Sequence, residues 1–98
     1  MAILSFRDAA TEDINDGHDS KTARRRLPRG LHDRARIKLA RLHAAAALSD
    51  LSGLPGNRLE KLVGYRSGQF SIRLNDRYRI CFVWTDQGAE QVEIVDYH

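Results

Sequence analysis

The sequence has little of what disulfide-bonded, metal-bound and membrane proteins need. It contains one cysteine, Cys81, which excludes an internal disulfide, and its four histidines lack the spacing of a zinc site. The start, MAILSFRDAA, has no apolar run long enough for a signal peptide or a membrane span. It also has no glycine-rich phosphate loop and no G-x-S-x-G motif. We therefore expect a single cytoplasmic domain over residues 1–98, with no membrane contact and no metal or other cofactor.

Charge is distributed unevenly along the chain. The formal net charge is +3, but residues 1–20 carry five acidic residues and one basic residue. Residues 21–41 carry nine basic residues against Asp33 alone. A basic block of this kind favours a polyanion or an acidic protein partner, while the simpler alternative is a helix with a solvated basic face.

The apolar pattern predicts an α+β fold with the order β-α-α-β-β-β-β. Apolar residues at positions 31, 35, 39, 42 and 46 follow helical spacing, whereas the second half of the chain alternates with the period of strands. We expect a polar, mobile loop over 17–30, and helices covering one face of an antiparallel sheet. The predicted helices are 8–16 and 31–46, and the predicted strands are 3–6, 58–63, 69–74, 78–84 and 92–96.

The turn at residues 75–77 decides how two of these strands pair. A three-residue loop sets Ile72 opposite Ile80 and keeps the apolar residues of both strands on one buried face. The same register places Arg73 directly opposite Arg79 on the other face, where like charges repel by up to about 1 kcal/mol. A bound anion would offset this repulsion, because the guanidinium group suits phosphate.

The sequence alone does not decide what the two arginines contact. The two guanidiniums can bind an anion, splay into solvent, or pair with Glu90 or Glu93 of the next strand. Arg66, in the loop YRSG before the sheet strand, can extend the cationic cluster.

The C-terminal stretch VEIVDYH combines a strand with three reactive side chains. In an unbroken strand, Asp96 and His98 share a side with Val92 and Ile94. Tyr97 then points the other way, toward the arginine face, if Val92 and Ile94 face the core.

Three pieces of the sequence are more specific than any pattern of charge or polarity. They read PGNRLE, SIRLNDRYRICF and VEIVDYH. Together with the opening SFRD and the helical segment ARIKLARLHAA, they make the chain resemble the HigB-type killer toxins of the RelE superfamily, from bacterial type II toxin–antitoxin systems. The resemblance covers essentially the whole chain.

The resemblance implies two N-terminal helices on a curved antiparallel sheet and an endoribonuclease that cleaves mRNA at the aminoacyl site of the translating ribosome. It also implies a HigA-like helix-turn-helix antitoxin as partner, through which alone the toxin meets operator DNA. Five residues match the catalytic positions of the family: Arg73, Arg79, Asp96, Tyr97 and His98. Five further cations are expected to assist in RNA placement: Lys61, Arg66, Arg34, Lys38 and Arg41, the last three facing either ribosomal RNA or an acidic partner.

Two positions depart from the family pattern. Val63 stands where relatives often carry a basic residue or histidine, and Tyr65 where they are commonly acidic. The alternative function is therefore a catalytically weak or inactive relative, which binds antitoxin or RNA and acts in operon regulation.

Overall fold

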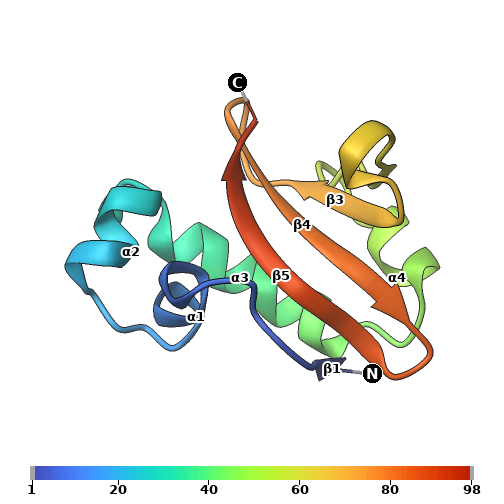
Figure 1. Ribbon diagram of the computed structural model, residues 1–98, viewed down its shortest axis with the longest axis horizontal. Helices are drawn as coiled ribbons and strands as arrows, with labels where there is room; N and C mark the ends of the chain where they lie inside the picture. Colours follow the sequence, from blue (N-terminus) through green and yellow to red (C-terminus); the bar gives the residue numbers. More distant parts are fainter. Residues whose placement is uncertain (1, 98) are drawn as a thin grey trace.

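The computed structural model describes residues 2–97, which form one five-stranded sheet with helices against it (Figure 1). The strands lie in the order β1-β5-β4-β3-β2, with β1 parallel to β5 and every other pairing antiparallel. The predicted α+β class is confirmed, and the parallel β1 makes the sheet mixed. In chain order the elements are β1 (Ala2–Ile3), α1 (Ala9–Asn15), α2 (Lys21–Arg26), η1 (Arg29–Leu31), α3 (His32–Ala44), α4 (Leu48–Ser52), β2 (Glu60–Lys61), η2 (Gly64–Arg66), β3 (Gln69–Arg73), β4 (Tyr78–Thr85) and β5 (Gly88–Asp96).

Helix α3 crosses one face of the sheet (Figure 1) and buries the middle of the apolar stripe that the sequence predicts. The prediction is wrong for Ala46, which is exposed and lies beyond the end of the helix. Ala35, Leu39 and Leu42 are fully buried and belong to the same core as the apolar side chains of β3, β4 and β5. The exposed charged residues of α3 lie on the side of the helix that points away from the sheet. Because α3 covers only one face of the sheet, the opposite face is free of this helix.

The segment predicted as a mobile loop contains a helix, α2, so that prediction is wrong for residues 21–26. Ser20 caps the helix, because its Oγ accepts a hydrogen bond from the backbone N–H of Ala23 at 3.0 Å. Arg26 ties the helix down by donating to Asp8 at 2.6 Å and to the carbonyl of Ile94 at 2.9 Å. Periodicity missed this helix because it has only one buried apolar residue to reveal it.

The predicted register of β3 and β4 is confirmed. Ile72 pairs with Ile80, and Arg73 pairs with Arg79. Because paired residues share a face of the sheet, both arginines lie on the face that turns away from α3.

Strand β5 contains one extra residue relative to β4, which the alternation alone does not reveal. The bulge lies at Gln91, whose φ is 52° and whose backbone N–H donates to Ser5 Oγ at 2.9 Å. It allows Ala89 and Val92, three residues apart, both to be buried. Beyond the bulge, Val92 and Ile94 face the core, so Glu93 and Tyr97 lie with the arginines.

Gly88 begins β5 at the place where β1 comes closest. Its φ is 141°, and a Cβ atom on this residue would lie 2.1 Å from the carbonyl oxygen of Ala2. Only glycine fits this approach, so Gly88 is required for the parallel pairing of β1.

Candidate functional site

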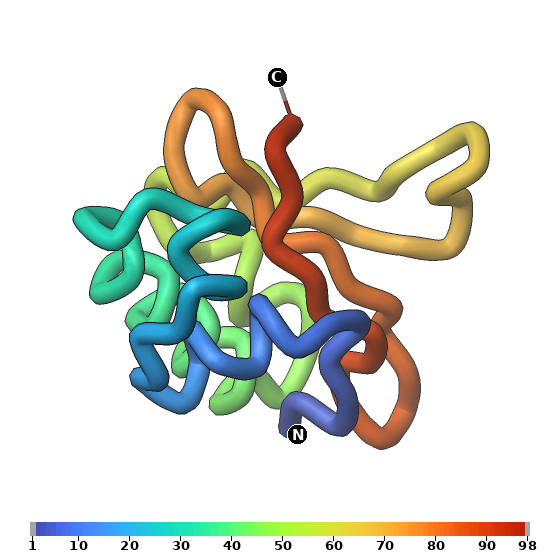
Figure 2. The backbone as a smooth tube through the Cα atoms, turned by 60° about the vertical axis from the view of Figure 1, so that its left-hand side comes forward, coloured from blue at the N-terminus to red at the C-terminus, as the bar shows by residue number. Residues whose placement is uncertain are grey.

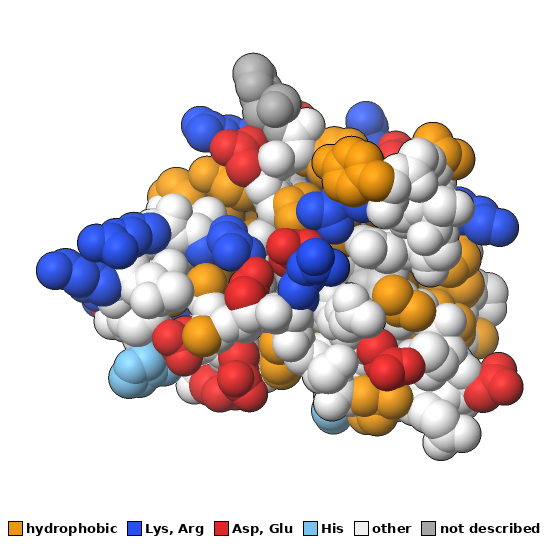
Figure 3. Space-filling view, viewed as in Figure 1, with side chains coloured by type: hydrophobic (Ala, Val, Ile, Leu, Met, Phe, Trp, Pro, Cys, Tyr) orange, Lys and Arg blue, Asp and Glu red, His pale blue; other side chains and the backbone are white. Residues whose placement is uncertain are grey.

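The face of the sheet away from α3 carries most of the charged side chains of the strands, with Tyr97 beside them just beyond β5. Figure 3 views the molecule from this side and shows basic and acidic side chains mixed across its middle. The hairpin of residues 60–70 projects from the body beside this face (Figure 2). The pairings and the alternation place the following residues on it: Glu60, Ser71, Arg73, Arg79, Cys81, Glu93, Val95 and Tyr97.

Arg79 is the most firmly held cation of this face. Its side chain is largely buried, with the residue 8% exposed. The Nε group donates to Ser71 Oγ at 2.7 Å, and Nη2 donates to the carbonyl of Arg58 at 2.6 Å. The remaining nitrogen, Nη1, lies 3.9 Å from Glu60 Oε1. The ring of Tyr97 covers the guanidinium, with 5.6 Å between the ring centroid and Cζ, which is a cation–π contact.

The loop that supports Arg79 is held by hydrogen bonds to α3 and α4. Arg58 has a φ of 43°, a left-handed conformation that is uncommon outside glycine, and its carbonyl receives the Arg79 hydrogen bond. The preceding Asn57 is fully buried and donates to the carbonyl of Leu51 at 3.1 Å. Asn57 Oδ1 accepts a hydrogen bond from Lys38 of α3. The strained turn therefore rests on satisfied buried polar groups.

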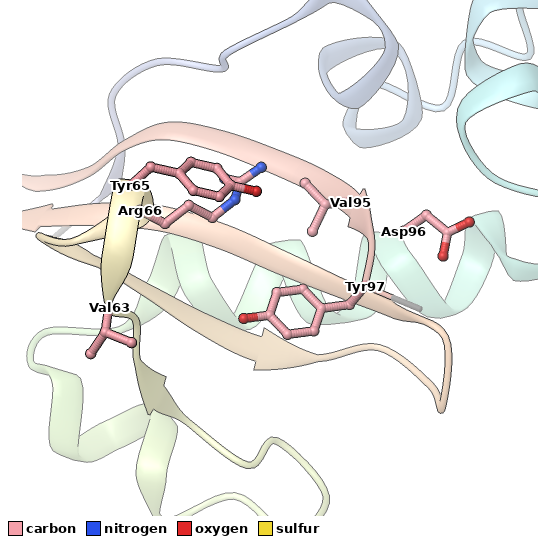
Figure 4. A pocket seen from close by; sticks show the side chains of 6 residues that line it. All are labelled: Val63, Tyr65, Arg66, Val95, Asp96 and Tyr97. Atoms are coloured by element: carbon pink, nitrogen blue, oxygen red, sulfur yellow. The ribbon is translucent and has the colours of Figure 1, made fainter.

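A cleft of about 330 Å³ lies between the projecting hairpin and the end of β5 (Figure 4). Tyr65 and Tyr97 extend into this space from opposite sides, Tyr65 from η2 and Tyr97 from just beyond β5. The guanidinium of Arg66 lies 5.9 Å from the Tyr65 ring centroid. The cleft is lined by Val63, Tyr65, Arg66, Val95, Asp96 and Tyr97. A planar ring beside a cation on each side suits a ligand that is both flat and anionic.

Arg66 is held toward the sheet by Glu93. Its Nη1 donates to Glu93 Oε1 at 3.2 Å and to Gln69 Oε1 at 3.1 Å, while Arg7 lies 3.8 Å from the other Glu93 oxygen. Burial works to lower the pKa of Arg66, but the hydrogen bond to Glu93 and the attraction of nearby Cys81 and Glu93 together outweigh it, so the pKa is raised. Burial raises the pKa of the neighbouring Cys81 thiol, which makes this cysteine a poor nucleophile.

The chain as a whole is similar to known proteins. Residues 4–98 match the family model described as the RelE-like toxin of the type II toxin–antitoxin system HigB. The chain is also 39% identical over 83 residues to Toxin HigB-1 of Vibrio cholerae serotype O1, which covers 85% of this chain and 84% of that protein. The chain belongs to the HigB-like family of RelE-like toxins. It is therefore the toxin of a type II toxin–antitoxin system, and an antitoxin is its partner.

The other residues predicted to be catalytic in this HigB-like toxin differ in their surroundings. Arg73 forms an ion pair with Asp76 in the β3–β4 turn. The guanidiniums of Arg73 and Arg79 therefore have different partners, although the two residues pair across the strands. Asp96 accepts two hydrogen bonds from Arg77, at 2.9 and 2.8 Å, and its carboxylate points away from the cleft (Figure 4). His98 lies outside the described residues, and its catalytic role stays a prediction.

The other cations expected to bind RNA do not join the cleft, apart from Arg66. Lys61 pairs with Phe70, which places it on the core side of the sheet at an exposed edge. Arg34 and Arg41 are exposed on α3, behind the sheet. Burial, together with the nearby arginines of α3 and β3, lowers the pKa of Lys38, whose ammonium is engaged by buried Asn57. Arg34 and Arg41 therefore form a basic surface on α3, on the other side of the sheet from the arginine face.

Within residues 2–97, no group of three or more His, Cys, Asp or Glu side chains is arranged to hold a metal ion. None of the helices in the same range is long and apolar enough to cross a membrane.

The sequence reasoning missed the residues that hold Arg79 in place. Ser71 could have been found, because the predicted register puts it on the arginine face, diagonal to Arg79. The Arg58 carbonyl and the Asn57 side chain leave no periodic signal, since both belong to an irregular loop.

Proposed function

We propose that this toxin is a ribosome-dependent endonuclease that cleaves mRNA without a metal ion, in the cytoplasm and at the ribosomal aminoacyl site. The observation that supports it best is the fixed guanidinium of Arg79 beside a cleft lined by Tyr97 and Arg66. A cation that is oriented before the reaction stabilises charge developing on a phosphate more effectively than a mobile one.

The proposed reaction uses the RNA as its own nucleophile. A base takes the proton of the 2′-OH, the 2′-oxygen forms a bond to phosphorus, and the bond from phosphorus to the 5′-oxygen breaks. An acid then gives the leaving 5′-oxygen its proton. The products are a 2′,3′-cyclic phosphate, which water can open to a 3′-phosphate, and a 5′-hydroxyl. DNA lacks the 2′-OH and is not a substrate.

The residues divide this work between charge, position and proton transfer. Arg79 binds the phosphate through Nη1. The phosphate takes the place of the exposed Glu60 carboxylate, which is held loosely, with Oε1 3.9 Å from Nη1. Arg73 adds charge when it leaves Asp76. Tyr97 stacks on a base or donates a hydrogen bond to the phosphate. His98 carries the protons, because an unperturbed imidazole titrates near neutral pH.

Asp96 is given an indirect role. Its carboxylate binds Arg77, and the backbone N–H of Tyr97 donates to the carbonyl of Arg77 at 2.7 Å. These contacts fasten the end of β5, so Asp96 positions Tyr97 and the residue after it. This arrangement favours orientation of His98 over proton transfer by Asp96 itself.

The partners follow from the same proposal. We expect a HigA-like helix-turn-helix antitoxin that neutralises the toxin and carries it to operator DNA. The basic surface of Arg34 and Arg41 then contacts ribosomal RNA or an acidic stretch of the antitoxin.

Induced expression tests the proposal. The wild-type toxin should arrest growth, relieved by the antitoxin, and primer extension should map cuts in translated mRNA. An Arg79→Lys variant keeps the charge but loses the fork, so its cleavage rate should fall by about tenfold or more. Arg36→Gln is the matched control, because Arg36 pairs with Asp33 on α3 and should leave cleavage unchanged.

Two results would contradict the proposal. If the wild type binds its antitoxin but cuts no translated mRNA, the alternative of a regulatory binding module is correct. If folded Arg79→Lys cuts as fast as the wild type, Arg79 has no part in catalysis. Circular dichroism and a thermal melt establish that each variant is folded.

A further inference from the structure

The tip of the projecting hairpin exposes two side chains that a folded domain ordinarily covers. Tyr65 is 96% exposed and Val63 is 84% exposed. Single exposed apolar residues are common and need no explanation. Here, however, both line the cleft that also contains the half-exposed Tyr97, so three exposed apolar side chains converge on one space.

Each of the two aromatic rings is paired with a guanidinium on the protein side. Arg66 lies 5.9 Å from the Tyr65 ring centroid, and Arg79 lies 5.6 Å from that of Tyr97. Such contacts orient the rings and hold a positive charge next to each of them. The ring faces not occupied by these cations remain open to a ligand.

The chemistry of the cleft selects an unpaired nucleotide. A nucleotide joins a flat base, which stacks on aromatic rings, to a phosphate, which binds guanidinium groups. The volume of about 330 Å³ lies at the small end of the range of small-molecule pockets, roughly 300–1,000 Å³, which fits a single base. An acidic peptide would use the cations but would leave Tyr65 without a stacking partner.

We propose that Tyr65 and Tyr97 form a two-sided stacking site for one unpaired base of the RNA substrate, with Val63 beside it and Arg66 on the adjoining phosphate. This inference rests on the proposed nuclease function. Tyr65 acts in binding, because it reaches the base from the hairpin tip and lies on the far side of the cleft from Tyr97 (Figure 4). Stacking tolerates every base, but a purine offers the larger surface, so purines should be preferred at this position.

The test measures binding apart from chemistry. The probe is a ribosome programmed with mRNA that carries a 2′-O-methyl group at the mapped cleavage site, which removes the nucleophile. Tyr65→Ala should weaken toxin binding to this probe by about tenfold, as expected for the loss of one stacked base. Tyr65→Phe and Tyr65→Trp should bind within about twofold of the wild type, because they keep the aromatic face. The single-turnover cleavage rate at saturation should change little in all three variants.

A matched control removes an exposed apolar residue elsewhere. Ile37 on α3 is 54% exposed, and Ile37→Ala should bind the probe as the wild type does. The inference is overturned if Tyr65→Ala binds normally, or if Tyr65→Phe is as weak as Tyr65→Ala. Loss of antitoxin binding in Tyr65→Ala with unchanged RNA binding would also overturn it, since the cleft would then serve the antitoxin. Each of these results leaves wild-type cleavage intact, whereas failure of the proposed function appears as a wild type that does not cut.

Discussion

The hydrogen bond between Ser71 and Arg79 gives the sharpest test of how the arginine face is held together. Ser71 is fully buried, and its Oγ accepts from Arg79 Nε at 2.7 Å. Replacing it by alanine leaves a charged N–H group buried without this acceptor. Hydrogen bonds to charged groups contribute about 1.5–3 kcal/mol, so Ser71→Ala should lower the free energy of unfolding by that amount. For a domain of about this size the Tm should fall by roughly 6–24 °C.

Urea unfolding followed by circular dichroism measures the loss. The midpoint should fall while the m-value stays constant, because the surface exposed on unfolding is the same. Ser67→Ala is the control, since Ser67 is exposed in the hairpin and should change stability by about 0.5 kcal/mol at most. A Ser71→Ala variant as stable as the Ser67→Ala control would refute the idea that Arg79 depends on this bond.

Three further outcomes test the fold that positions the site. Thr11 Oγ1 accepts from a buried β5 amide at 3.1 Å, so Thr11→Val should destabilise by about 1–3 kcal/mol in the same urea assay, and a neutral effect would contradict this contact. Gly88→Ala should release β1, because its Cβ would lie 2.1 Å from the Ala2 carbonyl; faster amide exchange in β1 is the readout, and unchanged protection would rule the clash out. Burial tends to raise the pKa of Asp8, but hydrogen bonds from Thr11 and Arg26 lower it overall. As the pH falls, the Asp8 carboxylate is therefore protonated in the unfolded state before it is protonated in the folded state. The stability from Asp8 is present above about pH 4 and is lost as the pH falls through the lowered pKa. Asp8→Asn should flatten this acid limb of a stability-against-pH curve, and an identical curve would exclude Asp8 as its source.

The sequence predicted the arginine face through one physical constraint. A slip of one residue between β3 and β4 would turn the apolar side chains of one strand to the other face, so the apolar alternation favours the register of the three-residue loop over that of the two-residue loop. That register places Arg73 opposite Arg79, as the structure confirms. Tyr97 is likewise found over Arg79, because the strand period beyond Val92 puts it on that face.

The contacts made by the charged groups were beyond the reach of the same reasoning. The like-charged pair is relieved by neighbours in turns, namely Asp76 for Arg73 and the Arg58 carbonyl for Arg79. Glu93, one of the acids considered for that pair, binds Arg66 instead. Turn conformation and side-chain rotamers decide these partners, and neither has a period in the sequence. The bulge at Gln91 was missed for the same reason.

The pairing of β1 with β5 links opposite ends of the described chain. Gln91 and Ser5, which hydrogen bond across this junction, are separated by 86 positions. Contacts at such separation form late, since loop closure must come before the contacts that reward it. During synthesis the N-terminal residues emerge first and stay without their β5 partner until that strand, with Glu93 and Tyr97, has been added. The face that holds Arg79 under Tyr97 is consequently absent from the growing chain and comes into being only when β5 is placed between β1 and β4. A molecule that recognises this face, whether nucleic acid or antitoxin, can meet it only after translation of β5 is complete.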